Sequence, residues 1–139
     1  MSRRRPKPQK PSKGKRIAAP RVDAEKPPQQ QTPIFCLHHL CGQYCLTKCD
    51  KDHQSAFARW QHTLSQLTWQ QIEIQRRHGQ GYERLPREIL KASIPSHVTE
   101  DVNLIAFRYL GKNPVVGYRD GRTFHVLFLD RDFSLYDHG

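Results

Sequence analysis

The sequence predicts an α+β domain in which two to three helices pack on a small C-terminal antiparallel sheet of three to four strands, preceded by a disordered basic tail. Three observations carry this prediction. Apolar residues recur every three or four positions in the middle of the chain, and they alternate with polar ones in its last third. Residues 1–32 are rich in Pro, Lys and Arg and poor in large apolar side chains. We therefore expect a disordered tail over residues 1–32 and one domain over residues 33–139.

The charge of the chain is concentrated in this tail. Of the formal net charge of +10, residues 1–32 contribute ten Lys or Arg against two acidic residues, and residues 33–139 contribute 13 against 11. Cations in such a tail, among them Arg3, Arg4 and Arg5, attract phosphates without base specificity. Contact with nucleic acid or the ribosome, a solubilising extension and a targeting role are the three interpretations that stay open.

Two absences bear on the compartment. No run of about 18 apolar residues is present, and the basic start lacks the apolar core of a secretory signal. We expect a cytoplasmic protein that does not span a membrane. In that compartment we expect its cysteines to be thiols or metal ligands and not to form disulfides.

Four cysteines crowd the entry to the domain, within residues 36–49. They are Cys36, Cys41, Cys45 and Cys49. Their spacing lacks the long insert between two tight knuckles that is typical of structural zinc sites. Packing as small apolar side chains is the ordinary interpretation, zinc binding and a reactive thiol are the alternatives, and no other cofactor is expected.

Three helices are predicted between the cysteines and the last third of the chain. Phe57, Trp60, Leu64 and Leu67 form one apolar stripe, which predicts a helix over residues 52–67. Thr68 and Gln71 have the form of a capping box, which predicts a second helix from Trp69 to about Gly79. A short helix is expected over residues 86–91, because Pro86 suits a first helical turn. Residues 34–40 are a candidate first strand.

A basic loop follows the second helix. Its candidate phosphate-binding residues are Arg76, Arg77, His78 and Arg84. The alternative is a solvated helix end, since cations near a helix C-terminus are favoured by its dipole.

The last third of the chain predicts a meander. A strand is expected over residues 103–110, and Asp120-Gly121 predicts a two-residue hairpin turn that pairs Val116 with His125 and Tyr118 with Thr123. An even turn within residues 130–133 would then pair Leu127 with Tyr136 and His125 with His138. The same face would carry Tyr118, His125, Tyr136 and His138, while Arg119 and Arg122 flank the hairpin tip as further candidates for nucleic-acid contact.

Two imidazoles on one face suit RNA cleavage by 2′-hydroxyl attack. The reaction needs a base, an acid and a cation for the charge on the phosphorus oxygens. His125 and His138 are the candidate base and acid, and Arg108 or Arg122 the candidate cation. A contact face and plain packing are the alternatives. The sequence lacks the motifs of P-loop nucleotide hydrolases, zinc proteases and serine hydrolases.

The order strand, helix, helix, short helix and antiparallel strands resembles the RelE/ParE-like toxins of bacterial toxin-antitoxin pairs. The resemblance extends from Ile34 to His138. It implies an endoribonuclease or another protein that acts on RNA or the ribosome, with an antitoxin protein as a partner. Carried over residue by residue, it makes these side chains eligible for a site: Arg108, Tyr118, Arg122, His125, Tyr136 and His138.

A second resemblance concerns the C-terminal stretch alone. The segment from Phe124 to Arg131, followed by Leu135 to His138, is similar to a little-characterised bacterial family, which implies no function. A non-enzymatic module that binds nucleic acid or protein, stabilised by zinc, is the alternative function.

Overall fold

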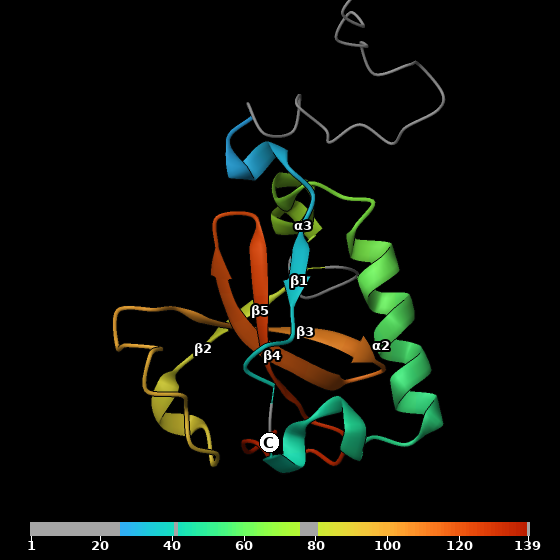
Figure 1. Ribbon diagram of the computed structural model, residues 1–139, viewed down its shortest axis with the longest axis vertical. Helices are drawn as coiled ribbons and strands as arrows, with labels where there is room; N and C mark the ends of the chain where they lie inside the picture. The colour runs from blue at the N-terminus through green and yellow to red at the C-terminus, as the bar shows by residue number, and fades with distance from the viewer. Residues whose placement is uncertain (1–25, 41, 76–80, 139) are drawn as a thin grey trace, which may run out of the picture.

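The structure, a computed structural model, describes residues 26–40, 42–75 and 81–138. Within them, a mixed five-stranded sheet in the order β1-β5-β4-β3-β2 lies beside two α-helices, which confirms the α+β class (Figure 1). The strands are β1 (Ile34–Cys36), β2 (Glu83–Leu85), β3 (Leu104–Leu110), β4 (Asn113–Asp120) and β5 (Thr123–Leu129), and the helices are α2 (Lys51–Leu64) and α3 (Trp69–Gln75).

Both helices begin where the sequence predicts. The Asp50 side chain caps α2 by accepting a hydrogen bond from the His53 amide at 2.9 Å. At the start of α3, the Gln71 side chain accepts from the Thr68 amide at 2.9 Å, and the Thr68 hydroxyl accepts from the Gln71 amide at 3.2 Å. The capping box is confirmed. The predicted end of this helix near Gly79 falls among residues 76–80, which lie outside the described part.

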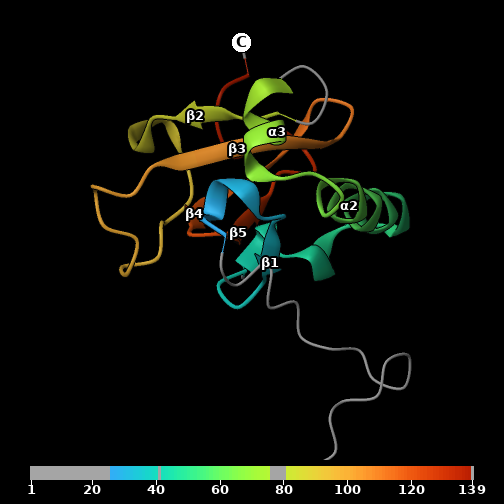
Figure 2. The same cartoon turned by 90° about the horizontal axis from the view of Figure 1, so that it is seen from above.

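The sheet has an apolar cluster on each face. The first cluster buries Phe57, Trp60 and Leu64 of the predicted stripe against β3, β4 and β5. The fourth residue, Leu67, is partly buried against the same cluster but lies beyond the end of α2, which ends three residues earlier than the sequence predicts. The second is formed by the opposite face of these strands together with Tyr44 from a 3-10 turn (Gly42–Tyr44) and with Val98, Leu135 and Tyr136 from irregular segments. Figures 1 and 2 show α2 along one side of the sheet and the segment between β2 and β3 on the other.

The predicted register of the β4-β5 hairpin is wrong by two residues. Asp120 pairs with Thr123, so the turn is Gly121-Arg122, and Tyr118 faces His125 directly. Gly121 takes the left-handed conformation, with φ of 61°, that the turn requires. Because a shift of two preserves the alternation of faces, Tyr118 and His125 still share the predicted face.

A β-bulge in β5 changes the faces further along the hairpin. Gly117 pairs with Val126 but Val116 pairs with Phe128, which leaves Leu127 as the extra residue. Leu127 and Phe128 consequently both belong to the second cluster, although neighbours in a regular strand point to opposite faces.

The predicted last strand is absent. Residues 130–138 are irregular, and the place beside β5 is taken by β1, which runs parallel to it and pairs Cys36 with His125. His138 is therefore not opposite His125, and Tyr136 is not opposite Leu127. An additional strand, β2, pairs with β3 at the far edge of the sheet, and the short helix reduces to a 3-10 turn at Arg87–Ile89.

The folded part begins earlier than the sequence predicts. A 3-10 turn at Pro28–Gln30 precedes β1, and Gln31 is only 8% exposed. Its carbonyl accepts a hydrogen bond from the Trp69 amide at 3.0 Å. The rest of the tail, residues 1–25, lies outside the described part.

Candidate active site

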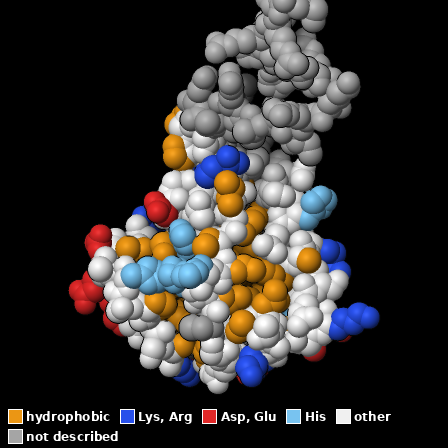
Figure 3. Space-filling view, viewed as in Figure 1, with side chains coloured by type: hydrophobic (Ala, Val, Ile, Leu, Met, Phe, Trp, Pro, Cys, Tyr) orange, Lys and Arg blue, Asp and Glu red, His pale blue; other side chains and the backbone are white. Residues whose placement is uncertain are grey.

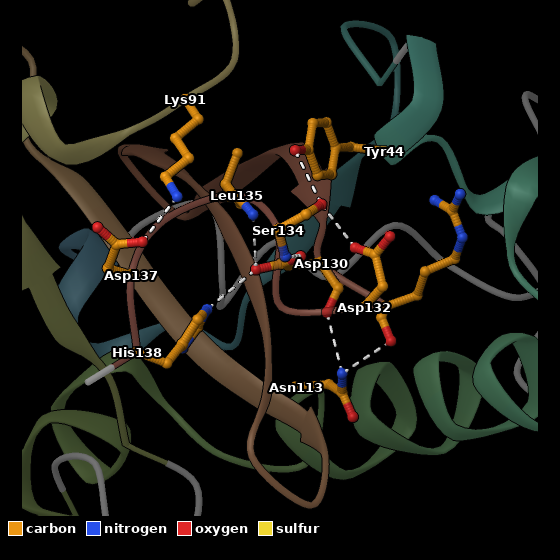
Figure 4. A network of polar contacts seen from close by, with 10 residues as sticks. Tyr44, Lys91, Asn113, Asp130, Asp132, Ser134, Leu135, Asp137 and His138 are labelled. Carbon is orange, nitrogen blue, oxygen red and sulfur yellow. Dashed lines mark hydrogen bonds and ion pairs between the residues drawn. The ribbon is translucent and has the colours of Figure 1, made fainter.

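Asp130, directly after β5, is fully buried and anchors the C-terminal segment. Its Oδ1 accepts a hydrogen bond from the Ser134 amide at 2.8 Å, and its Oδ2 accepts from the Leu135 amide at 3.2 Å (Figure 4). A buried carboxylate is costly unless such donors surround it. The carboxylate therefore folds the chain back on itself after β5, in place of the hairpin that the sequence predicts.

The same carboxylate holds His138. His138 Nε2 lies 3.1 Å from Asp130 Oδ2, and its ring stacks on Tyr136 with the ring centroids 4.1 Å apart. An acceptor at one ring nitrogen fixes the tautomer and orientation of an imidazole, and it favours the proton there. Nδ1 is then the nitrogen that can accept a proton from another molecule.

A pocket of about 600 Å³ opens beside this pair. Volumes of this size are typical of sites for small molecules. Its lining includes Arg108 from β3, Lys112 from the β3-β4 turn, Phe133, Tyr136 and His138. Three of the six side chains that the sequence makes eligible for a site, Arg108, Tyr136 and His138, thus border one pocket.

The charges at the pocket favour an anion. Arg108 pairs with Pro114 through the backbone of β3 and β4, but within the described part of the chain the side chains of Arg108 and Lys112 make no hydrogen bond or ion pair. Of the two carboxylates at the lining, Asp137 is paired with Lys91 at 2.6 Å. The other is Glu83.

Tyr136 remains a neutral phenol under ordinary conditions. Burial, reinforced by the carboxylates of Glu83 and Asp130, raises its pKa to about 12, and Arg108 opposes that shift. The phenol is therefore a hydrogen-bond donor and not a base.

Two of the other eligible side chains, Tyr118 and His125, lie in a separate cluster. His125 stacks on Tyr118 with the ring centroids 4.6 Å apart, and its centroid lies 6.1 Å from that of His39. The ring contacts of His138, by contrast, are with Phe133 and Tyr136. The predicted base and acid pair of His125 and His138 is therefore not assembled.

Sequence reasoning missed several residues of both sites. They are Lys112 at the pocket, Asp130 behind His138, and His38, His39 and His97 beside His125. Asp130 carries a usable signal, since an acidic residue directly after a buried strand needs donors of its own. His97 lies in an irregular segment, residues 90–103, whose path no periodicity indicates.

The predicted nucleic-acid contacts divide into three groups. Arg119 lies 4.3 Å from the centroid of the Trp69 ring and donates to the Gly121 carbonyl, and Arg122 donates to the carbonyl and hydroxyl of Thr32. Both serve the fold, whereas Arg84 is exposed. Arg3, Arg4, Arg5, Arg76, Arg77 and His78 lie outside the described part.

The cysteines form no metal centre in the described part of the chain. Cys36, Cys45 and Cys49 are free thiols, Cys41 lies outside, and no described group of three or more His, Cys, Asp or Glu residues is placed to hold a metal ion. Cys49 packs in the first cluster, and burial raises the pKa of its thiol. This arrangement agrees with packing as its role.

The described helices include none that is long and apolar enough to cross a membrane. Comparison with known families, curated proteins and solved structures finds no match for the chain.

Proposed function

We propose that the protein is a metal-independent endoribonuclease that acts on RNA, as the resemblance to RelE/ParE-like toxins implies. The observation that carries the proposal is the Asp130-His138 pair beside a pocket that Arg108 and Lys112 also line. A general base oriented by a carboxylate, next to two cations, is the equipment that phosphodiester cleavage requires.

The roles follow from the chemistry of each group. His138 Nδ1 takes the proton of the ribose 2′-hydroxyl, and the 2′-oxygen attacks phosphorus. The bond to the 5′-oxygen breaks, and that oxygen takes a proton from the Lys112 ammonium. The products are a 2′,3′-cyclic phosphate and a 5′-hydroxyl end.

The remaining groups bind and orient the substrate. Arg108 stabilises the charge on the non-bridging oxygens, and the neutral phenol of Tyr136 donates a hydrogen bond. Asp130 acts through His138 and is a positioning residue.

The test is cleavage of a single-stranded RNA by the full chain in the presence of a chelator. His138→Gln removes the base, so we expect a loss of about 100-fold or more in rate. His62→Gln, on the exposed side of α2, is the matched control and should leave the rate unchanged. Products that end in a cyclic phosphate would identify the mechanism.

Two outcomes would reject this proposal. Cleavage that is equally fast in the His138→Gln variant would remove the assigned base. RNA binding without any cleavage by the unaltered chain would favour the alternative, a non-enzymatic nucleic-acid-binding module.

In a bacterial host, a toxin-like role predicts growth arrest on expression. The arrest should disappear in the His138→Gln variant and persist in the His62→Gln control. An antitoxin protein would be a partner whose co-expression restores growth.

A further inference from the structure

Four histidines and a tyrosine meet at a surface away from the pocket. This imidazole cluster consists of His38, His39, His97, His125 and Tyr118. The centroids of His39 and His97 are 3.9 Å apart, those of His38 and His39 are 4.6 Å apart, and His97 Nε2 lies 3.0 Å from the Tyr118 hydroxyl. Figure 3 shows histidines gathered in one patch with apolar side chains around them.

Four parts of the chain supply these rings. His38 and His39 follow β1, Tyr118 belongs to β4, His125 belongs to β5, and His97 comes from the irregular segment between β2 and β3. Because Cys36 pairs with His125, the residues that follow β1 lie close to His125. The cluster thus depends on the strand pairing that sequence reasoning did not foresee.

The cluster has several basic nitrogens and little negative charge. The charged groups that act on His39 are His97, His38 and His125, all of the same kind. Around Tyr118 the acidic groups are Asp120 and the Cys36 thiol. Within the described part, Nδ1 of His125 is buried and has no hydrogen-bond partner. Protonation of these rings would therefore create positive charge that a bound anion can balance.

We infer that the imidazole cluster is a proton-coupled binding site for the phosphates of single-stranded RNA. A protonated imidazole has two N–H donors for phosphate oxygens, and its ring face can stack on an unpaired base. The choice of RNA as the ligand rests on the proposed function, but the site contains none of the residues that act in the proposed cleavage steps.

The pH dependence has a definite sign. Burial, followed by repulsion from the neighbouring imidazoles, lowers the pKa of His39 from its ordinary value. Binding of phosphate favours the protonated rings and must therefore be accompanied by proton uptake. Affinity should rise as the pH falls through the range in which imidazoles titrate.

The test is the binding of a fluorescent single-stranded RNA to the full chain carrying His138→Gln, which prevents cleavage. Between pH 8 and pH 5.5 we expect the affinity to rise about tenfold or more. Adding His39→Gln and His97→Gln should remove most of that rise, whereas adding His62→Gln should leave it intact. Lys and Arg, including those of the tail, remain charged throughout this range and contribute equally at both pH values.

A second measurement covers the case in which the double variant is less stable. Inorganic phosphate added to the His138→Gln chain at pH 5.5 should shift the ring resonances of His39 and His97 in the NMR spectrum and leave those of His62 in place. Equal pH profiles for the double variant and the His62→Gln variant, or unmoved cluster resonances, would overturn the inference. Failure of the unaltered chain to cleave RNA would overturn the proposed function alone, because neither binding measurement depends on cleavage.

Discussion

Gly117 is a residue whose side chain the sheet cannot tolerate. A Cβ atom built at this position would lie 1.9 Å from the carbonyl oxygen of His125 and 2.9 Å from the ring of Phe124. The close approach belongs to the bulge at Leu127, which brings the backbone of β5 against β4. Gly117→Ala should therefore lower the free energy of unfolding by about 2–4 kcal/mol, as measured by chemical denaturation.

Gly111→Ala is the control for this substitution. Gly111 has φ of 57° but open space around its Cα, so the change adds backbone strain without a clash. Its cost should be about 1 kcal/mol. If both variants lose the same stability, the close contact at Gly117 is not what requires a glycine.

His39 makes the stability depend on pH. Its pKa is lowered in the folded protein, so the unfolded chain binds more protons as the pH falls. The stability is complete above the unfolded pKa, near 6.5, and is lost as the pH falls through that value toward the folded pKa. In denaturation curves recorded between pH 8 and pH 5, the free energy of unfolding should decline less for His39→Gln than for the unaltered chain.

The control for His39 is His62→Gln, which removes an exposed imidazole from α2. If His39→Gln leaves the decline unchanged, neither the burial of His39 nor repulsion from the neighbouring imidazoles contributes to the pH dependence.

At the scale of elements, the start of α2 depends on one side chain. Asp50 accepts the His53 amide at 2.9 Å and satisfies a donor that has no partner within the helix. Asp50→Ala should cost about 1 kcal/mol of stability and Asp50→Asn clearly less, as measured by thermal and chemical denaturation. An equal loss in the exposed neighbour variant Lys51→Ala would show that capping is not the cause.

Elements whose signals are local could be predicted from the sequence. The stripe of Phe57, Trp60 and Leu64 and the box of Thr68 and Gln71 need only neighbouring residues, and both are confirmed. The signal for the hairpin turn is local as well, but Asp120-Gly121 and Gly121-Arg122 are both candidates for its two central residues. The same residues share a face with either turn, whereas the residues that pair across the hairpin differ.

Elements set by distant contacts could not be predicted. The residues after β5 do not form a strand because the buried Asp130 carboxylate takes the amides of Ser134 and Leu135. The free edge of β5 is instead covered by β1, from almost 90 residues earlier in the chain. For this reason the predicted site residues lie in two separate places. His138 lies beside Asp130, and His125 lies near His39, which follows β1.

Across the whole molecule, most of the net positive charge lies in one part of the chain and the candidate site residues lie in another. Residues 26–139 contain 14 Lys or Arg and 11 Asp or Glu, whereas residues 1–25 contain nine Lys or Arg and two acidic residues. Arg119 and Arg122 are engaged in the fold. The folded part therefore offers specific groups, at the pocket and the imidazole cluster, but little long-range attraction for RNA.

Removal of residues 1–25 should consequently weaken RNA binding more than it alters cleavage of bound RNA. Each phosphate neutralised on a single strand contributes about 0.7 to the slope of log affinity against log salt concentration. We expect the truncated chain, bearing His138→Gln to prevent cleavage, to bind RNA more weakly at low salt and to show a slope smaller by several such contributions. Fluorescence titrations at a series of salt concentrations measure both quantities.

A chain in which the nine Lys and Arg residues of this segment are replaced by Gln should behave like the truncated one, because charge and not length supplies the attraction. Equal slopes for the full and truncated chains would instead place the phosphate contacts within residues 26–139.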